Sequence, residues 1–264
     1  MIKTNYHTHT KLCNHAEGMA IDYIKRAVEC GYQEIGISDH GPLLDSWNHL
    51  RMDLDQFLNL YIKNIDEAIF KYSDQIKIYK GLELEYLKEY QDHYHQLLKN
   101  LDYLILGQHI IIQNDEIIDI YKGFDEEQMG IYRDMVIEGM ATNYFKILAH
   151  PDLFLFKKQP WTPYIEKISR DIIEASIKHQ VFLEINVNGM RRGTFHNQDG
   201  EITYIYPRLE FWKLVSEYPN ALIIINEDNH ALRYVDDSFC QEARVFANKL
   251  NIKVSKYLFG EKNE

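Results

Sequence analysis

Cysteine, proline and glycine are all scarce in this 264-residue chain. The three cysteines, Cys13, Cys30 and Cys240, form no CxxC pair, which argues against a disulfide framework and a thiolate zinc site. The six prolines and 13 glycines are scattered, and no Ser/Gly-rich stretch, charge block or repeat marks a linker or an array. We therefore expect a single domain over residues 1–264 and a reducing compartment, the cytoplasm.

Long apolar runs and an excess of positive charge are absent as well. The segment MIKTNYHTHT has no apolar signal core, and no uninterrupted apolar run approaches the roughly 20 residues of a membrane span, so no membrane partner is expected. The net charge of −11 disfavours nucleic acid as a main partner, because an acidic surface repels phosphate backbones. An anionic substrate would need a local positive site, and the sequence leaves the oligomeric state open.

Apolar, β-branched runs alternate with helical stretches, which is the pattern of parallel βα units. The strand candidates are 2–7, 34–39, 76–84, 101–109, 145–150, 181–186 and 221–226. The expected helices are 17–30, 53–72, 88–99, 125–139, 164–178, 208–217 and 236–249. Seven such units suit a barrel-like α/β fold, and an open doubly wound sheet is the main alternative. The run 252–255 is either an edge-like strand or a tail across the barrel bottom.

Histidines and carboxylates follow nearly every expected strand. His7 and His9 are two residues apart on the first strand, so both imidazoles face one side, and His15 lies in the next loop. The later strands end in Ser38-Asp39-His40, Gly81-Leu82-Glu83, Gly107-Gln108-His109, Ala149-His150-Pro151-Asp152 and Asp228-Asn229-His230. In a closed barrel these ends meet on one face, which favours closure and a metal cluster. Taken singly, each residue would more often be structural.

The remaining histidines lie outside this pattern. His93, His95 and His179 are on or beside expected helices and are predicted to be surface residues, and His196 lies in a polar loop. His49 is a loop histidine that could overhang the site and contact a substrate, although its position favours an exposed role somewhat more.

The ordered set HTH, His15, SDH, a GxE strand end, GQH, AHPD and DxH resembles the PHP family of polymerase and histidinol phosphatase domains, over nearly the whole chain. The resemblance implies a distorted (β/α)7 TIM-like barrel. It also implies two or three divalent ions, zinc, iron or manganese, with Glu83 as the bridging carboxylate and Asp39 orienting a ligand histidine. The implied metal ligands are His7, His9, His15, His40, Glu83, His109, His150, Asp228 and His230.

The segment 184–192 resembles the family's EIN-x-x-G-x-R stretch, whose arginine is expected to hold the substrate phosphate. That arginine is Arg191, with Arg192 as the alternative, and a pair of surface arginines is the structural interpretation. Glu227 is a departure, because a carboxylate beside the last motif would repel phosphate unless it is turned outward.

Within this family the chain resembles the histidinol-phosphate phosphatases. The resemblance implies hydrolysis of L-histidinol phosphate, a step of histidine biosynthesis, by a hydroxide that bound metal activates. Asp228, His230 and Arg191 are the catalytic candidates, and Arg191, Arg192 and His49 are the substrate-binding candidates. The alternatives are a phosphoesterase for another small phosphate ester or nucleotide, and a noncatalytic metal-binding domain.

Overall fold

The computed structural model describes residues 3–43 and 50–260. Its main sheet has seven strands in the order β1-β2-β3-β4-β7-β8-β11, and neighbouring strands are parallel. The strands are β1 (Thr4–Asn5), β2 (Glu34–Ile37), β3 (Lys77–Leu84), β4 (Tyr103–Leu106), β7 (Phe145–Leu148), β8 (Phe182–Asn186) and β11 (Ile223–Asn226). All four residues of β4 are buried, as expected for a parallel strand covered on both faces.

The first and last strands of this order come together, so the sheet is nearly closed into a barrel. Beyond the carboxyl ends of β1 and β11, Thr8 forms a parallel bridge with Asn229. At the other end, Val254 bridges to Ile223 of β11, and Thr4 of β1 donates a hydrogen bond to the carbonyl of Lys256. The expected barrel is therefore confirmed, the open doubly wound sheet is excluded, and the run 252–255 contributes a single bridge beside β11.

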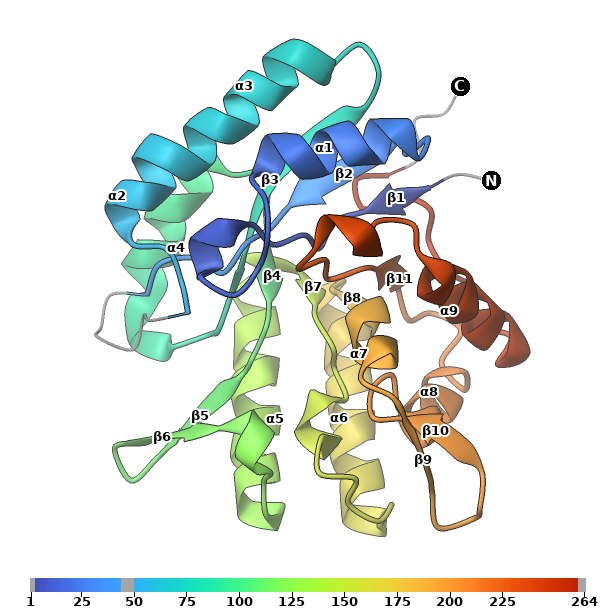
Figure 1. The fold of residues 1–264 in the computed structure, drawn as a ribbon. Coiled ribbons are helices and arrows are strands. Elements are labelled where there is room, and N and C mark those ends of the chain that lie inside the picture. The colour runs from blue at the N-terminus through green and yellow to red at the C-terminus, as the bar shows by residue number, and fades with distance from the viewer. Residues whose placement is uncertain (1–2, 44–49, 261–264) are drawn as a thin grey trace.

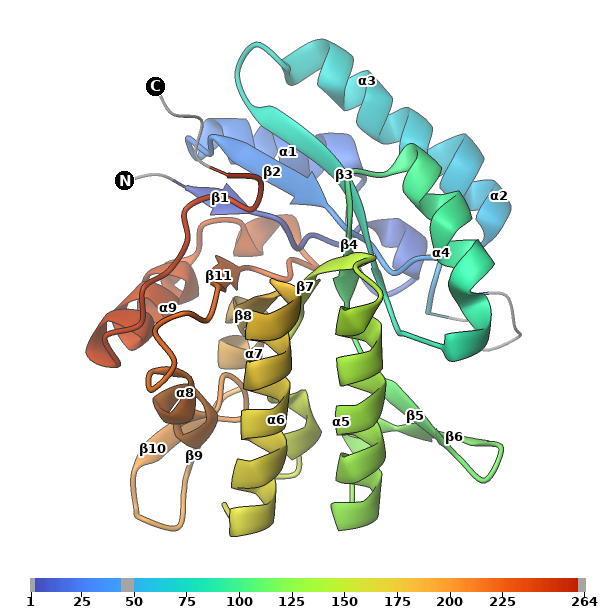
Figure 2. The same cartoon turned by 180° about the vertical axis from the view of Figure 1, so that it is seen from behind.

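Helices cover the outside of the sheet (Figures 1 and 2). They are α1 (Ala20–Glu29), α2 (Leu54–Gln56), α3 (Ile62–Tyr72), α4 (Gln91–Leu97), α5 (Glu126–Ala141), α6 (Pro163–His179), α7 (Val187–Arg191), α8 (Leu209–Val215) and α9 (Ser238–Lys249). A π-helical turn, Phe57–Tyr61, joins α2 to α3. Helix α6 illustrates the local signals, since Thr162 caps its first turn through the N–H of Ile165 and Pro163 occupies the first helical position. None of the helices in the described ranges is long and apolar enough to cross a bilayer.

The barrel interior is filled at the end away from the strand carboxyl termini. Tyr6, Tyr103 and Ile224 are buried in one cluster, and Leu258 packs against it from the C-terminal segment. The Tyr103 hydroxyl donates to the carbonyl of Tyr6. A Cβ atom at Gly36 would lie 2.0 Å from that hydroxyl, so glycine is what admits the tyrosine there. Any open site must therefore lie at the carboxyl end of the strands.

Three elements lie outside the expected pattern. The hairpin β5 (Ile110–Gln113) to β6 (Glu116–Asp119) projects from the barrel, and β9 (Thr194–His196) pairs with β10 (Ile202–Tyr204) in a second hairpin (Figure 1). Helix α7 follows β8 directly. The first hairpin turns at Asn114 and Asp115, which both have positive φ, as a tight type I′ turn requires.

The prediction that His93 is a surface residue is wrong. Its side chain is buried, and its Nε2 lies 2.7 Å from the carbonyl oxygen of Pro42. His93 lies in the first turn of α4, whereas His95 and His196 are exposed. The faces of a helix this short could not be assigned from its sequence pattern.

Candidate metal centre

The nine residues of the expected ligand set converge at the carboxyl end of the barrel. Their nitrogen and oxygen atoms form three groups of three, each within 4.8 Å: His7, His9 and Asp228; Glu83, His109 and His150; His15, His40 and His230. Each residue belongs to one of these groups, and the groups are contiguous because His9, His40 and Glu83 also meet the same criterion. The arrangement is that of a polynuclear cation site rather than of separate histidines.

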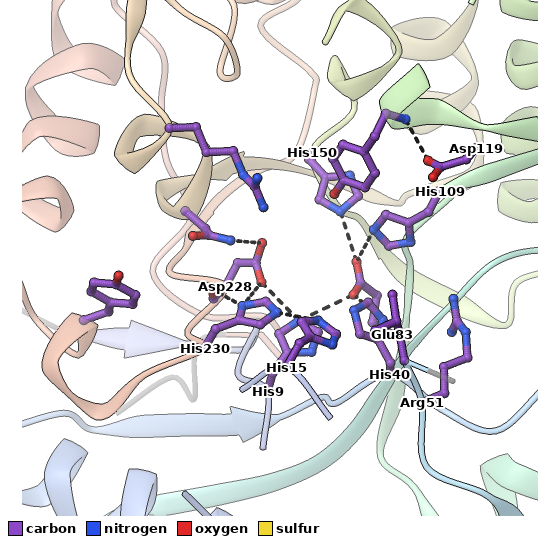
Figure 3. A pocket seen from close by; sticks show the side chains of 15 residues that line it. His9, His15, His40, Arg51, Glu83, His109, Asp119, His150, Asp228 and His230 are labelled. Carbon is purple, nitrogen blue, oxygen red and sulfur yellow. Dashed lines mark hydrogen bonds and ion pairs between the residues drawn. The ribbon is translucent and has the colours of Figure 1, made fainter. Parts of the chain in front are cut away.

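Glu83 lies between two of these groups (Figure 3). Its Oε1 is 3.1 Å from His150 Nε2 and 3.6 Å from His109 Nε2. Its Oε2 is 3.4 Å from His7 Nε2 and 3.1 Å from His40 Nδ1. Since Oε1 faces His109 and His150 while Oε2 faces one histidine from each of the other two groups, Glu83 has the geometry of a bridging ligand.

The other contacts are equally short. His9 Nε2 lies 3.0 Å from Asp228 Oδ1, and His15 Nε2 lies 3.1 Å from His230 Nε2. Asn186 and Asn188 both donate to Asp228 Oδ2, at 3.1 and 3.2 Å. These amides occupy one oxygen of Asp228 and leave Oδ1 facing the histidines.

Oxygen acceptors hold the far nitrogen of most ligand histidines. The Nδ1 atoms of three of them face carboxylates, His7 at Glu184 (2.8 Å), His9 at Asp39 (3.3 Å) and His109 at Glu85 (3.0 Å). His15 and His230 make the same kind of contact with the backbone carbonyls of Cys13 and Asp228. Such contacts fix the tautomer, so that Nε2 presents its lone pair to the centre.

Electrostatics acts on these groups in different directions. Burial favours the neutral form of Glu83, but the surrounding imidazoles, His7 first, hold the pKa of its carboxyl well below the ordinary value. Burial and the neighbouring His230 lower the pKa of His15 to about 4, so its imidazole is neutral at pH 7. Burial would also lower the pKa of His7, yet nearby carboxylates, Glu184 first, raise it well above its ordinary value.

The buried polar atoms and the donor types of the site fit a bound cation. Asp228 Oδ1 and His40 Nδ1 are buried, and although His9 Nε2 and Glu83 Oε2 lie 3.0 and 3.1 Å away, neither atom makes a well-aligned hydrogen bond within residues 3–43 and 50–260, which is costly unless an ion satisfies them. Cys13 also lies within reach of His9 and His230, but burial raises the pKa of its thiol, which donates to the carbonyl of Thr10. Imidazole and carboxylate donors together suit zinc, iron and manganese.

The backbone is shaped around the same groups. A Cβ atom on Gly107 would lie 2.1 Å from Glu83 Oε1, so glycine is required for the carboxylate to lie where it does. His150 and Asp228 both have positive φ, at 33° and 48°, which non-glycine residues seldom adopt. Backbone strain of this kind is found mainly where side-chain direction serves a site.

A pocket of about 490 Å³ opens over the ligand groups (Figure 3). Besides eight of the nine ligands, all but His7, the residues that line it are Leu50, Arg51, Asp119, Tyr121, Asn188, Arg192 and Tyr234. Arg51 is buried and forms an ion pair with Glu85. The pocket thus combines a floor of metal-binding groups with two guanidinium groups, which suits an anionic ligand.

The two adjacent arginines are placed differently. Arg191 points away from the pocket, where its Nε lies 2.8 Å from Asp237 and its other nitrogens donate to the carbonyls of Glu227 and Tyr234. Arg192 lines the pocket, with its Cζ 5.8 Å from the centre of the Tyr121 ring. Of the two arginines, Arg192 lines the pocket and Arg191 does not.

Glu227 and His49 complete the residues singled out in the sequence. Glu227 is buried outside the pocket, where Tyr32 and Asn229 donate to its carboxylate, and burial raises its pKa. It is therefore turned away from any phosphate. His49 lies outside the described residues.

Three acidic residues of the site were missed in the sequence, namely Glu184, Glu85 and Asp119. Glu85 follows Glu83 by two residues, and Glu184 precedes Asn186 by two, so strand alternation alone places each beside the site. Alternation along the strands could therefore have identified Glu85 and Glu184 from the sequence. Asp119 had no such signal, because the hairpin that carries it was not expected.

A parallel barrel that gathers imidazoles and carboxylates beyond its strand ends belongs to the class of α/β barrels with a metal centre at the carboxyl face. The sequence model of the PHP domain matches residues 5–188, more than half of the chain. The chain belongs to the PHP family, as its motifs predicted.

Relatives and a solved structure agree with this assignment. A Schizosaccharomyces pombe protein named "Probable histidinol-phosphatase" is 26% identical over 256 residues, covering 85% of this chain and 79% of that protein. A Shigella flexneri protein named "Probable phosphatase YcdX" is 26% identical over 188 residues, covering 70% and 64%. The structure of histidinol phosphate phosphatase from Lactococcus lactis, complexed with zinc, L-histidinol and phosphate, has a TM-score of 0.71 at 17% identity, covering 96% and 95%. At that identity the structural match shows the shared fold.

Proposed function

We propose that this protein is a metal-dependent phosphomonoesterase that hydrolyses L-histidinol phosphate to L-histidinol and phosphate. The observation that carries the proposal is the convergence of three contiguous ligand groups on the floor of one pocket, with Arg192 on its wall. The S. pombe relative and the ligands of the L. lactis structure support the choice of substrate.

The nine-residue ligand set would hold two or three divalent ions. When bound, such ions supply an activated water nucleophile at neutral pH and neutralise charge on the phosphoryl oxygens. Glu184, Asp39 and Glu85 keep three ligand imidazoles in the required tautomer. Asn186 and Asn188 keep Asp228 directed at the same centre.

Arg192 is the residue we assign to the substrate phosphate. A guanidinium group matches phosphate oxygens in a bidentate fashion and retains its charge at any accessible pH. The nearby tyrosines Tyr206 and Tyr121 raise the pKa of Arg192 further. Asp228 and His230 both line the pocket. Burial raises the pKa of the Asp228 carboxyl, but nearby imidazoles, His7 first, hold it well below its ordinary value, so His230 is the better candidate for protonating the leaving alkoxide.

The test is phosphate release from L-histidinol phosphate beside a panel of other phosphomonoesters, with zinc- or manganese-loaded protein and a chelated control. We expect chelator-sensitive turnover that is fastest with histidinol phosphate. Fast turnover of other esters alone would retain the metal centre and refute the substrate. Metal binding without turnover of any ester would indicate a noncatalytic domain.

The second candidate is a phosphatase for a different small phosphate ester. The S. flexneri relative, whose name specifies a phosphatase and no substrate, is the observation that favours it. The same ester panel separates the two candidates.

A further inference from the structure

Asp119 is an acidic residue of the pocket that the metal-binding groups leave unexplained. It ends strand β6 of the projecting hairpin and lines the pocket, yet it belongs to none of the ligand groups. In Figure 3 it lies on the His109 side of the site, away from Asp228 and His230. A carboxylate there opposes the binding of a phosphate dianion, so its presence calls for a compensating positive charge.

No side chain in the described ranges supplies that charge. Asp119 forms no ion pair with any lysine, arginine or histidine of residues 3–43 and 50–260. Its Oδ1 accepts a hydrogen bond from the backbone N–H of Tyr121, at 2.8 Å, and thereby caps the short 3-10 helix Ile120–Lys122. The second oxygen, Oδ2, makes no hydrogen bond within the same ranges. Because Asp119 also stands outside the metal-ligand groups, a cationic group on the bound molecule is a natural partner for it.

Asp119 and the proposed phosphate-binding residue Arg192 both contact Tyr121. Arg192 approaches the Tyr121 ring, and Asp119 binds the Tyr121 backbone, so a guanidinium and a carboxylate flank one aromatic residue of the pocket wall. A small molecule that spans them would carry an anion at one end and a cation at the other.

We infer that Asp119 selects phosphate monoesters whose alcohol carries a cationic amine, and that it pairs with this ammonium group. The inference rests on the proposed function, because L-histidinol phosphate is one such ester. Beyond that function, Asp119 of the β5–β6 hairpin is the residue that determines specificity, and amine-bearing phosphate monoesters are the substrate class.

The variant Asp119→Asn tests this directly, since asparagine retains the capping oxygen and removes the charge. The measurement is the ratio of kcat/KM for L-histidinol phosphate to kcat/KM for its analogue without the amino group, 3-(imidazol-4-yl)propyl phosphate. We expect D119N to lower this ratio by about ten- to hundred-fold, the usual range for a hydrogen bond to a charged group. Glu116→Gln, an equal charge change at an exposed position of the same strand, should leave the ratio at the wild-type value.

An unchanged ratio in D119N would overturn the inference, even if both rates fall, because an equal fall indicates a purely structural cap. Failure of the proposed function is recognised separately, by a wild-type protein that releases no phosphate from either ester. In that case the calorimetric affinities of zinc-loaded protein for 2-aminoethyl phosphate and ethyl phosphate replace the rates. A wild-type preference for the aminoalkyl ester that D119N removes would support the inference, and its persistence in D119N would refute it.

Discussion

At the scale of single residues, Arg191 and Arg192 show how neighbours in sequence acquire unrelated roles. Successive residues of a helix point about 100° apart, so the end of α7 directs one guanidinium toward the segment 227–237 and the other into the pocket. The motif indicated that one of these two arginines binds the phosphate. It did not indicate which one, because the direction of Arg191 depends on Asp237 and Tyr234, which are distant in sequence.

These placements predict different effects for two matched variants, one on substrate binding and the other on stability. Arg192→Gln should raise KM for the phosphate ester by about ten- to hundred-fold, the usual effect of losing a charge-assisted hydrogen bond, with the melting temperature retained. Arg191→Gln should instead lower the melting temperature, because it leaves Asp237 and two carbonyls without their donor. Steady-state kinetics and calorimetry on both variants decide, and a larger KM effect from Arg191 would contradict the assignment.

The pKa values of the ligand histidines predict that metal binding releases protons. His7 and His109 have raised pKa values, since the pull of nearby carboxylates exceeds the effect of burial, so the metal-free protein holds these protons to a higher pH than free imidazoles do. A cation must displace them, and zinc affinity should therefore increase as the pH rises, by up to about tenfold per pH unit for each displaced proton.

Calorimetric titration in buffers of different ionisation enthalpy counts the protons released. Variant His95→Gln, at an exposed histidine outside the site, should release as many as the wild type. Zinc binding at pH 7 with no proton release would show that these histidines are already neutral.

At the scale of elements, the strand ends were predictable and the insertions were not. Parallel strands are buried on both faces, so their apolar runs stand out, and the polar residues after each run mark the carboxyl edge. The hairpin at Ile110–Asp119 was hidden because its apolar first strand continues the run that begins at β4, and the structure interrupts that run at Gly107. Asn114-Asp115 was the available turn signal.

The carboxyl end of β4 yields a prediction for Gly107. Variant Gly107→Ala introduces a methyl group where Glu83 Oε1 now lies, so the bridging carboxylate must move. We expect weaker zinc binding and a fall in kcat of about 10- to 100-fold, comparable with the loss of an outer-shell contact at a metal site.

Gly130→Ala on α5 is the control, because its added methyl would meet only the Tyr164 hydroxyl, at 3.0 Å. Elemental analysis and the turnover rate of the two variants are compared. A G107A protein with the zinc content and rate of the wild type would show that Glu83 does not have to lie where the structure places it.

At the scale of the whole molecule, barrel closure brings together a site whose parts are far apart in sequence. His9 and Asp228 are separated by more than 200 residues, and the bridge between Thr8 and Asn229 places them in contact. The ligand types and the closed barrel followed from the strand-end motifs. The partners behind the ligands were partly predictable, because alternation along a strand places Glu85 on the same side as Glu83, whereas the ligand that each carboxylate contacts depends on how the barrel closes.

The central claim is that these three ligand groups hold the ions on which phosphate release depends. The most direct test is the rate of phosphate release from L-histidinol phosphate as metal-free protein is titrated with zinc or manganese, with bound metal measured in the same samples. The account predicts no turnover without metal and a rate that reaches its plateau at two or three ions per chain. Full turnover by protein that holds no ion would contradict it.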